Sequence, residues 1–332
     1  MNKYIGHSIQ ESGTYEYRLI GGKADGMRIL RVKNGKGLDF EISLDRCADI
    51  VTLSLNGTNL GYMSPCGYVN PKYYQPTGRG FLKSFSAGFF TTCGLFTVGD
   101  PCIDEGEELP LHGTISNTPS EKYSVEETDE EITIKATVRD ATILSHQLLL
   151  IRTYTISKTE NKITLSDTVK NIGSKESPIM LLYHCNMGYP LLSENAEVVI
   201  PSDTVIPKNE HARGDIENSR KMEKPQRGYK GRCYYYDIKE KNGIGKCGIY
   251  NPDIEKGVVI GFDKKTLDKF TQWKMMGEYE YVLGLEPGNC NTDGRDVMRK
   301  EGKLRFIKPD EEYVTNLTFN FVCDKEKFAE EF

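Results

Sequence analysis

Long apolar runs are missing from the 332-residue chain, and no segment approaches the roughly 18 uninterrupted apolar residues that a membrane-spanning helix needs. Residues 1–10 contain one lysine and no apolar stretch of the kind that forms the centre of a secretory signal. The sequence therefore predicts a soluble protein that is neither exported nor bound to a membrane. We expect a cytoplasmic location.

Paired cysteines are missing as well. The nine cysteines are an odd number, and none stands in a Cys-x-x-Cys pair. This pattern favours reduced thiols over a disulfide framework and offers no zinc-binding spacing. The acidic run at residues 104–108 lacks the Asp/Asn spacing of a calcium-binding loop. We expect neither a metal nor another cofactor.

Positive charge does not gather anywhere in the sequence. The 43 Lys and Arg residues are outnumbered by 48 Asp and Glu residues, which makes the formal net charge −5, and the basic residues are scattered. A surface that binds nucleic acid needs a basic patch or stripe. Nucleic acid is therefore not an expected partner, and the sequence leaves the oligomeric state open.

Helical periodicity is absent too, and the pattern that is present is the alternation of half-buried β-strands. Residues that are mostly apolar recur at every second position in 132–138, 163–169 and 317–321. Further runs rich in β-branched and aromatic residues lie at 148–156, 179–183, 198–200, 234–236, 258–262 and 281–285. The 32 glycines and 14 prolines are spread along the chain, as many turns require. We predict an all-β fold in one domain over residues 1–332, with a long polar surface excursion at 209–231.

Only five histidines are present, and the surroundings of two of them stand out. His112 precedes a glycine, which lacks a Cβ and lets the backbone approach closely. His184 follows the apolar run 179–183 and precedes a Gly/Pro turn, where a rigid strand can present a polar side chain to a cleft. Either histidine could instead be satisfied by a backbone hydrogen bond and have no further role.

A carboxylate stands in a similar position. Glu286 follows the apolar run 281–285 and precedes a Pro-Gly-Asn turn. We expect Glu286, His184 and His112 to lie at three strand ends around one shared site. In such a site a carboxylate can act as a general base and a histidine as a general acid, because an enclosed environment can tune both pKa values.

The short motifs around these residues resemble those of the aldose 1-epimerase (galactose mutarotase-like) superfamily. Residues 169–186 are similar to the strand pair that ends in one of the family's histidine motifs, 111–113 to its other histidine motif, and 284–287 to the place of its catalytic glutamate. The order His, His, Glu along the chain matches as well. An uncharacterised, domain-of-unknown-function branch of the superfamily is the most similar, through segments 45–50, 91–95 and 111–113. The resemblance implies a β supersandwich of large, twisted antiparallel sheets.

The resemblance also implies a chemistry. In the family, a glutamate takes the proton from the anomeric hydroxyl of a sugar while a histidine protonates the ring oxygen, so that the ring opens and closes again on its other face. By position, Glu286 is the base and His184 is the acid. His112 hydrogen-bonds a hydroxyl group or the open-chain oxygen of the sugar.

Four further residues are candidates for binding the sugar, and each has a structural alternative. Arg46 could hold a sugar oxygen with its planar guanidinium, or form an ion pair with a neighbouring aspartate. Trp273, the single tryptophan, could stack on a sugar face or fill the core. Asn186 and Asn289 flank the expected catalytic pair, and their amides could bind sugar hydroxyls or simply stabilise turns.

Two departures from the mutarotase motifs leave the substrate open. Thr114 stands where a second glycine usually follows the first histidine motif, and Asp45 replaces the Asn of an Asn-Arg pair. The leading hypothesis is an isomerase that interconverts the anomers of a free sugar or sugar derivative. The alternative is a carbohydrate-binding or sensing protein without turnover, and β-elimination from a uronate is a third interpretation that rests on the fold alone. In each case the expected partner is a small-molecule carbohydrate.

The basic residues bear on the kind of sugar that the cleft accepts. If their side chains converge on the cleft, one wall becomes cationic and favours an acidic or sulfonated sugar. The residues considered for this wall are Arg46, Arg79, Lys83 and Arg295.

Overall fold

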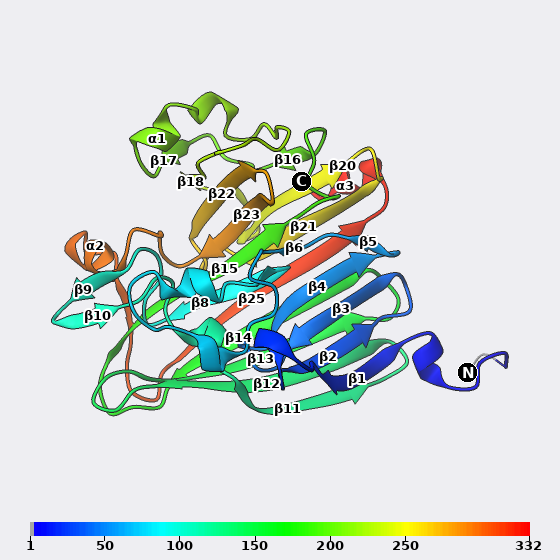
Figure 1. Cartoon of the computed structure of the whole chain (residues 1–332), viewed down its shortest axis with the longest axis horizontal. Helices are drawn as coiled ribbons and strands as arrows, with labels where there is room; N and C mark the ends of the chain where they lie inside the picture. Colours follow the sequence, from blue (N-terminus) through cyan, green and yellow to red (C-terminus); the bar gives the residue numbers. More distant parts are fainter. Residues whose placement is uncertain (1–2) are drawn as a thin grey trace.

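The computed structural model describes residues 3–332 and confirms an all-β fold (Figure 1). Strands hold 48% of the residues and helices 11%, so sheets form the framework and helical turns serve mainly as connections. The framework consists of three large antiparallel sheets, of nine, seven and five strands, and two small two-stranded ribbons. This is the arrangement of large antiparallel sheets that the family resemblance implies.

The nine-stranded sheet forms from the segments with the clearest alternation. Its strands are β11 Ser120–Glu127, β12 Glu131–Ala141, β13 Gln147–Ser157, β14 Lys162–Asn171, β16 Glu197–Val199, β19 Glu240–Lys241, β20 Ile244–Asn251, β21 Lys256–Asp263 and β25 Glu312–Val322. They pair in the order β11-β12-β13-β14-β25-β21-β20-β16, with β19 on β20. In β12 every second side chain from Ile132 to Val138 is buried, because successive side chains point to opposite faces.

The five-stranded sheet packs against the nine-stranded sheet through a buried ion pair. Its strands are β1 Gly13–Arg18, β2 Arg28–Lys33, β3 Leu38–Ser43, β4 Asp49–Leu55 and β5 Thr58–Asn59. Arg152 in β13 reaches Asp49 in β4 at 2.5 Å and Asp167 in β14 at 2.6 Å. These three buried charges need one another, because a buried charge without a partner is strongly destabilising.

The seven-stranded sheet is covered on both faces. Its strands are β8 Phe90–Leu95, β15 Ser177–Met187, β17 Val205–Pro207, β18 Arg232–Tyr236, β22 Lys269–Gly277, β23 Glu280–Gly288 and β24 Arg305–Ile307. They pair in the order β17-β18-β22-β23-β15-β24, with β8 on β15. Nearly every residue of β15 and β23 is buried, so these strands appear in the sequence as apolar runs and not as alternation.

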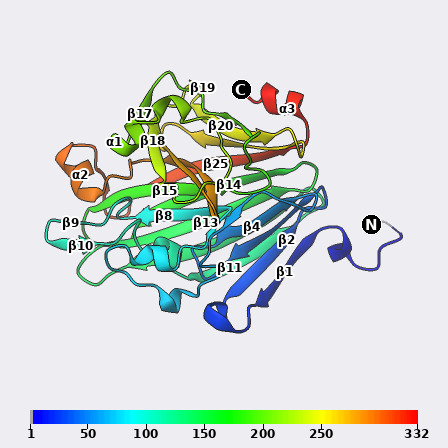
Figure 2. The ribbon, with the colours of Figure 1, turned by 45° about the horizontal axis from the view of Figure 1, so that its top comes forward.

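The remaining elements are short. The ribbons pair β6 Tyr62–Met63 with β7 Ala87–Gly88, and β9 Cys102–Asp104 with β10 Glu107–Leu109. The helical segments are η1 Ser8–Gln10, η2 Gly22–Ala24, η3 Pro71–Tyr73, η4 Gly80–Lys83, η5 Ile115–Asn117, α1 Glu210–Arg213, η6 Ile216–Asn218, α2 Arg295–Lys300 and α3 Lys325–Glu330. Figure 2 shows β8 beside β15, and α2 beside the β9–β10 ribbon at one end of the molecule.

One hydrophobic cluster joins the sheets, since it runs from Leu30 in β2 to Phe321 in β25 and includes side chains from all three large sheets. Every strand predicted from the sequence is confirmed, and the polar excursion 209–231 contains only α1 and η6 as regular elements. No helix within residues 3–332 is long and apolar enough to cross a membrane.

The expectation that His184 and Glu286 stand at strand ends is wrong. β15 continues to Met187 and β23 to Gly288, so both residues lie inside paired strands. The reason is that the neighbouring strands continue the hydrogen-bonded ladder to Met187 in β15 and through Pro287 and Gly288 in β23.

Candidate active site

His184 and Glu286 are cross-strand neighbours in the seven-stranded sheet. β15 pairs with β23 in an antiparallel register that sets His184 opposite Glu286. On the other side of β23, Thr271 in β22 is the partner of Glu286, and Thr91 in β8 is the partner of His184. Side chains at directly opposite positions lie on the same face of a sheet. The register thus forms a row of polar residues across four strands.

Three residues of this row line a pocket with a volume of about 210 Å³: His184, Glu286 and Thr271. His112 and Trp273, which come from a loop and from β22, belong to the same lining. The other lining residues are Arg79, Phe81, Leu82, Phe85, Gly99, Asp100, Leu111, Lys208, Cys233 and Thr292. The structure therefore brings the three titratable residues named from the sequence together around one small cavity.

The imidazole of His184 is held in one orientation by Asn186. His184 Nδ1 lies 2.7 Å from Asn186 Oδ1, an amide oxygen that can only accept, so Nδ1 carries the proton. In the neutral ring this leaves Nε2 as a free acceptor. Nε2 lies 3.2 Å from Glu286 Oε1, an oxygen that makes no hydrogen bond within the described residues 3–332. The two functional groups are thus within reach of one proton transfer.

Burial shifts the two pKa values in opposite directions. It raises the pKa of Glu286 to about 8, an effect that the positive charge of Lys208 opposes. It lowers the pKa of His184 to about 4, an effect that the hydrogen bond with Asn186 opposes. In both residues, loss of water disfavours the charged form. At neutral pH the carboxyl group of Glu286 is therefore protonated. The imidazole of His184 keeps only its Nδ1 proton and is neutral, so one proton is available to move between the carboxyl group and Nε2.

Gly284 makes room for the carboxyl group of Glu286. The two residues are two positions apart in β23 and lie on the same face of the strand. A Cβ added at Gly284 would lie 2.3 Å from Glu286 Oε1 and 3.0 Å from Trp273 Cβ. The absence of a side chain at position 284 is therefore what lets the carboxyl group occupy its place.

His112 enters the pocket from the loop between β10 and η5. Its φ of 58° lies in the left-handed region, and Gly113 follows with a φ of 74°. A Cβ at Gly113 would lie 2.2 Å from the Gly94 carbonyl oxygen, which confirms the close backbone approach expected from the sequence. The ring is 5.8 Å from that of His184 and nearly perpendicular to it. Burial lowers the pKa of His112, and no described residue forms a hydrogen bond with its buried Nδ1.

Aromatic rings form an apolar wall of the pocket. The rings of Phe81 and Phe85 are stacked at 4.9 Å, and Phe85 lies 6.5 Å from Trp273. Trp273 is half-buried, packs on this cluster and also lines the cavity. Trp273 thus packs against hydrophobic side chains and also faces the cavity. A flat apolar wall beside polar groups suits the C–H face of a small polar ring.

Arg46 does not belong to the pocket lining. Its side chain is buried, and Nη1 donates to the Val69 carbonyl and to Asn117 Oδ1, both at 3.0 Å. It does not form the alternative ion pair either, because the neighbouring aspartates pair with Arg28 and Arg152. Arg46 therefore contacts the protein interior and not the cavity.

Asn186 and Asn289 also lie outside the lining, because their amides are used within the protein. Asn186 Oδ1 accepts from His184, and its Nδ2 donates to backbone carbonyls. Asn289 Oδ1 accepts from the Leu181 N–H at 2.8 Å and its Nδ2 donates to the Ile179 carbonyl, which ties the end of β23 to β15. Asn186 positions the imidazole, whereas Asn289 has a structural role.

Of the other basic residues considered from the sequence, Arg79 lines the pocket, whereas Lys83 and Arg295 do not. Lys83 Nζ donates to Gln75. Arg295, in α2, pairs with Asp104 at 2.6 Å on the β9–β10 ribbon. The cationic wall is therefore not the one that the sequence suggested.

Lys208, Asp100 and Thr271 line the pocket but were missed from the sequence. Lys208 Nζ donates to Asp100 Oδ2 at 2.8 Å and to the Thr292 carbonyl at 2.7 Å. Thr271 is 1% exposed, and among the residues that the structure describes its hydroxyl has no hydrogen-bond partner. Its place two residues before Trp273, on the same face of a strand, is a signal that could have found it. No motif marks Lys208 or Asp100.

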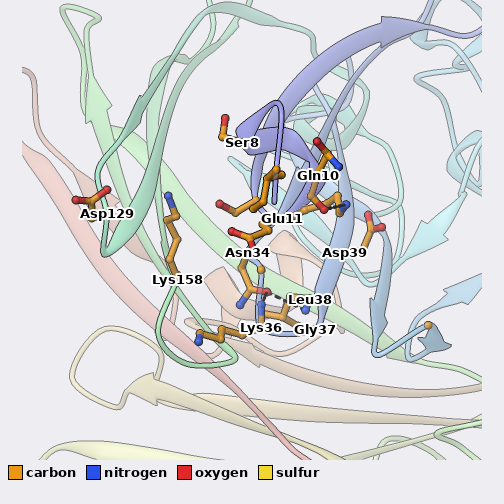
Figure 3. Close-up of a pocket in the computed structure, with 15 residues that line it drawn as sticks. Ser8, Gln10, Glu11, Asn34, Lys36, Gly37, Leu38, Asp39, Asp129 and Lys158 are labelled. Carbon is orange, nitrogen blue, oxygen red and sulfur yellow. Dashed lines mark hydrogen bonds between the residues drawn. The ribbon is translucent and has the colours of Figure 1, made fainter. Parts of the chain in front are cut away.

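A larger pocket, of about 840 Å³, lies beside the N-terminal segment (Figure 3). Its polar groups are largely engaged within the protein. Asn34 Nδ2 donates to the carbonyls of Ser157 and Glu160, and Lys158 Nζ pairs with Glu127. Among the described residues that line it there is no histidine or cysteine. Across residues 3–332, no group of three or more His, Cys, Asp or Glu side chains could hold a metal ion.

The fold is that of the galactose mutarotase-like proteins. A putative aldose 1-epimerase from Klebsiella pneumoniae subsp. pneumoniae MGH 78578 superimposes with a TM-score of 0.90 at 24% identity, over 97% of this chain and 90% of that chain. A galactose mutarotase-like protein from Clostridium acetobutylicum gives 0.69 at 13% identity, over 94% and 99%. Galactose 1-epimerase from Lactobacillus acidophilus NCFM gives 0.62 at 12% identity, over 93% and 98%. At these identities the likeness shows the fold alone.

The chain belongs to the family described as Domain of unknown function (DUF4432), which matches residues 24–321. This agrees with the branch that the motifs resemble. No curated protein matches the sequence.

Proposed function

We propose that the protein is an aldose 1-epimerase-like isomerase, which interconverts the anomers of a free sugar or sugar derivative. The observation that supports this most directly is the His184–Glu286 pair, whose ring nitrogen and carboxyl oxygen are 3.2 Å apart in a small cavity. The cavity combines this pair with an aromatic wall and polar groups, as a small-molecule site does. The fold shared with structures named as aldose 1-epimerases agrees with the proposal.

The closeness of the two groups suits anomerisation. The anomeric hydroxyl oxygen and the ring oxygen of a sugar are bonded to the same carbon atom. An acid and a base that act on these two oxygens must therefore lie side by side. If they stood on opposite walls of a sugar-sized space, the distance between them would be too large. Cross-strand neighbours on one face of a sheet meet this requirement.

Ring opening uses the carboxylate–imidazolium form of the pair. Glu286 takes the proton from the anomeric hydroxyl, C1=O forms, the bond from C1 to the ring oxygen breaks, and His184 Nε2 gives its proton to that oxygen. The pair is left as a protonated carboxyl and a neutral imidazole, the form that burial favours at neutral pH. After rotation about C1–C2, closure reverses both transfers. The pair therefore returns to its starting protonation state after each cycle of opening and closure, without a net gain or loss of protons.

His112 and Thr271 are suited to hold substrate oxygens. Each has a buried polar atom that no other described residue hydrogen-bonds, and buried polar atoms normally have a partner. A neutral imidazole and a hydroxyl can each donate a hydrogen bond to an oxygen that gains negative charge. Both residues line the cavity together with the His184–Glu286 pair.

The shared proton leads to a bell-shaped pH profile for kcat/KM. We expect a plateau between about pH 4, where His184 also becomes protonated, and about pH 8, where Glu286 loses the proton of the pair. The anomer exchange rate would be followed by NMR from acid to alkaline pH, with the buffer-catalysed rate subtracted. A rate that keeps rising through pH 8 would mean that Glu286 is a lone base, and the shared-proton mechanism would be abandoned.

Substitution of Gly284 by alanine is expected to lower activity and to cost some stability. The new methyl group would displace Glu286 Oε1, which ends a flexible side chain, and would also press on Trp273 Cβ at 3.0 Å. A displacement of about 1 Å costs roughly a hundredfold in rate. Melting temperature and exchange rate would be measured together. The control is Gly277→Ala at the end of β22, where the new Cβ would lie 3.1 Å from the Met275 methyl and at ordinary contact distance, 3.5 Å, from the Glu280 carbonyl oxygen. Full activity of Gly284→Ala would show that Gly284 is not needed to place the carboxyl group.

Anomer exchange also separates this proposal from the alternative of a binding protein without turnover. The two motif departures do not reach the pocket, because Thr114 donates to Asp140 and Asp45 pairs with Arg28. Single anomers of several aldoses and uronates would be dissolved freshly and their optical rotation followed with and without the protein. We expect faster equilibration for at least one sugar. A sugar that raises the melting temperature without any faster equilibration would identify a binding protein instead.

A further inference from the structure

Three charged side chains, here called the cationic edge, border the pocket: Arg79, Asp100 and Lys208. Asp100 lies between the two cations. Its Oδ1 accepts from Arg79 Nη2 and its Oδ2 from Lys208 Nζ, both at 2.8 Å. One carboxylate thus faces two positive charges, and within the cationic edge one unit of positive charge is left over.

Arg79 keeps donors for a ligand, and one of the three hydrogen bonds of Lys208 is long. Of the three N–H groups of Lys208, two go to Asp100 and the Thr292 carbonyl, and the third has only a 3.4 Å contact with Thr292 Oγ1. Arg79 has five N–H donors, and among the described residues it donates only to Asp100. Its side chain is 62% exposed, so the guanidinium can turn toward a ligand at the mouth of the pocket.

No other charge in the lining offsets the cationic edge. Glu286 is the one other acidic residue among those that line the cavity, and burial keeps it protonated at neutral pH. His112 and His184 are neutral for the same reason. Lys208 and Arg79 both lower the pKa of His112, which indicates that their positive field extends into the cavity.

We propose that the substrate of this pocket is an anionic sugar, whose carboxylate, phosphate or sulfonate group binds Lys208 and Arg79 while the His184–Glu286 pair acts on its anomeric carbon. This inference rests on the proposed function and names the class of substrate. A neutral sugar leaves the positive charge uncompensated, whereas an anionic group accepts charge-assisted hydrogen bonds from both cations. The planar guanidinium of Arg79 matches the geometry of such groups.

The test measures binding apart from turnover. Dissociation constants for glucose, glucuronate and glucose 6-phosphate, and for galactose and galacturonate, would be determined by ligand-observed NMR with the full-length protein at neutral pH. We expect an anionic sugar to bind roughly tenfold to a hundredfold more tightly than its neutral counterpart, as hydrogen bonds to charged groups allow. Its affinity should fall as salt is added, because ions screen the attraction. Whether carboxylate or phosphate binds better identifies the anionic group.

Two variants test whether Lys208 and Arg79 bind the anionic group, and a third variant serves as a control. Lys208→Met and Arg79→Gln should each remove most of the preference for the anionic sugar over its neutral counterpart. Lys83→Met removes a nearby lysine that ends the helical turn after Arg79 but does not line the pocket, and it should change nothing. Melting temperatures establish that each variant is folded.

Failure of this inference can be distinguished from failure of the proposed function, because sugar binding and anomer exchange are measured separately. Tighter binding of an anion that depends on Lys208 supports the inference even if no sugar equilibrates faster, in which case the isomerase fails and the anionic ligand stands. Equal affinities for neutral and anionic sugars, no binding of any anionic sugar, or an equal effect of Lys83→Met would overturn it.

Discussion

Replacing Glu286 with glutamine is expected to slow anomer exchange by roughly a hundredfold to ten-thousandfold, the usual contribution of a general acid or base. Glutamine keeps the shape of the side chain but can neither take nor return a proton. The change is gentle on the structure, because among residues 3–332 Oε1 makes no hydrogen bond and only faces His184 Nε2 at 3.2 Å. The rate would be measured by polarimetry on the sugar that the wild type equilibrates fastest.

The stability of this variant provides an internal check. Burial raises the pKa of Glu286 from 4.5 to about 8, so the folded protein holds a proton that the unfolded chain releases between these values. The stability linked to that proton is present below pH 4.5 and is lost as the pH rises to about 8. Glutamine does not titrate, so Glu286→Gln should melt like the wild type in acid and at a higher temperature near pH 8.

Glu280→Gln is the matched control. Glu280 begins the same strand but is exposed, and it does not line the pocket. This variant should keep the full exchange rate. If Glu286→Gln were as fast as Glu280→Gln, Glu286 would not be the group that moves the proton.

Replacing His184 with glutamine should cause a loss of similar size, roughly a hundredfold to ten-thousandfold. The amide reaches toward the position of Nε2 but cannot carry the proton between the ring oxygen and the protein. The distinctive result is the shape of the pH profile. The residual activity should lack the limb near pH 4, because that limb belongs to the imidazole.

His211→Gln is the control for this substitution. His211 is exposed in α1, contacts the Lys230 carbonyl and does not line the pocket. It should leave both the rate and the pH profile unchanged. An acid limb that persists in His184→Gln would assign the titration to another group and would contradict the role of the pair.

The fold could be predicted from the sequence to a large extent. Strands such as β12 and β14 have one buried face, and their period of two appears directly in the sequence. β15 and β23 are buried on both faces, so they showed only apolar runs, yet their length and β-branched content were enough to identify them. Their exact ends were not predictable, because the ladder is continued by strands from distant parts of the chain.

The centre of the candidate site was also predictable, but its edge was not. Glu286, His184 and His112 lie within short motifs that could be recognised one by one. Arg46 lies in a motif as well, yet its side chain turns into the interior, a direction that residue order does not specify. Lys208 reaches the pocket only because β17 pairs with β18 at the edge of the sheet, a long-range contact without a local signal.

The most direct test of the account is exchange NMR on the sugar that the wild-type protein binds. Cross-peaks between its α and β anomeric protons should appear when the wild type is added at neutral pH, and they should be absent with Glu286→Gln at the same concentration. Cross-peaks of equal intensity with both proteins, or none with the wild type on any sugar that binds, would contradict the central claim that the His184–Glu286 pair opens and closes a sugar ring.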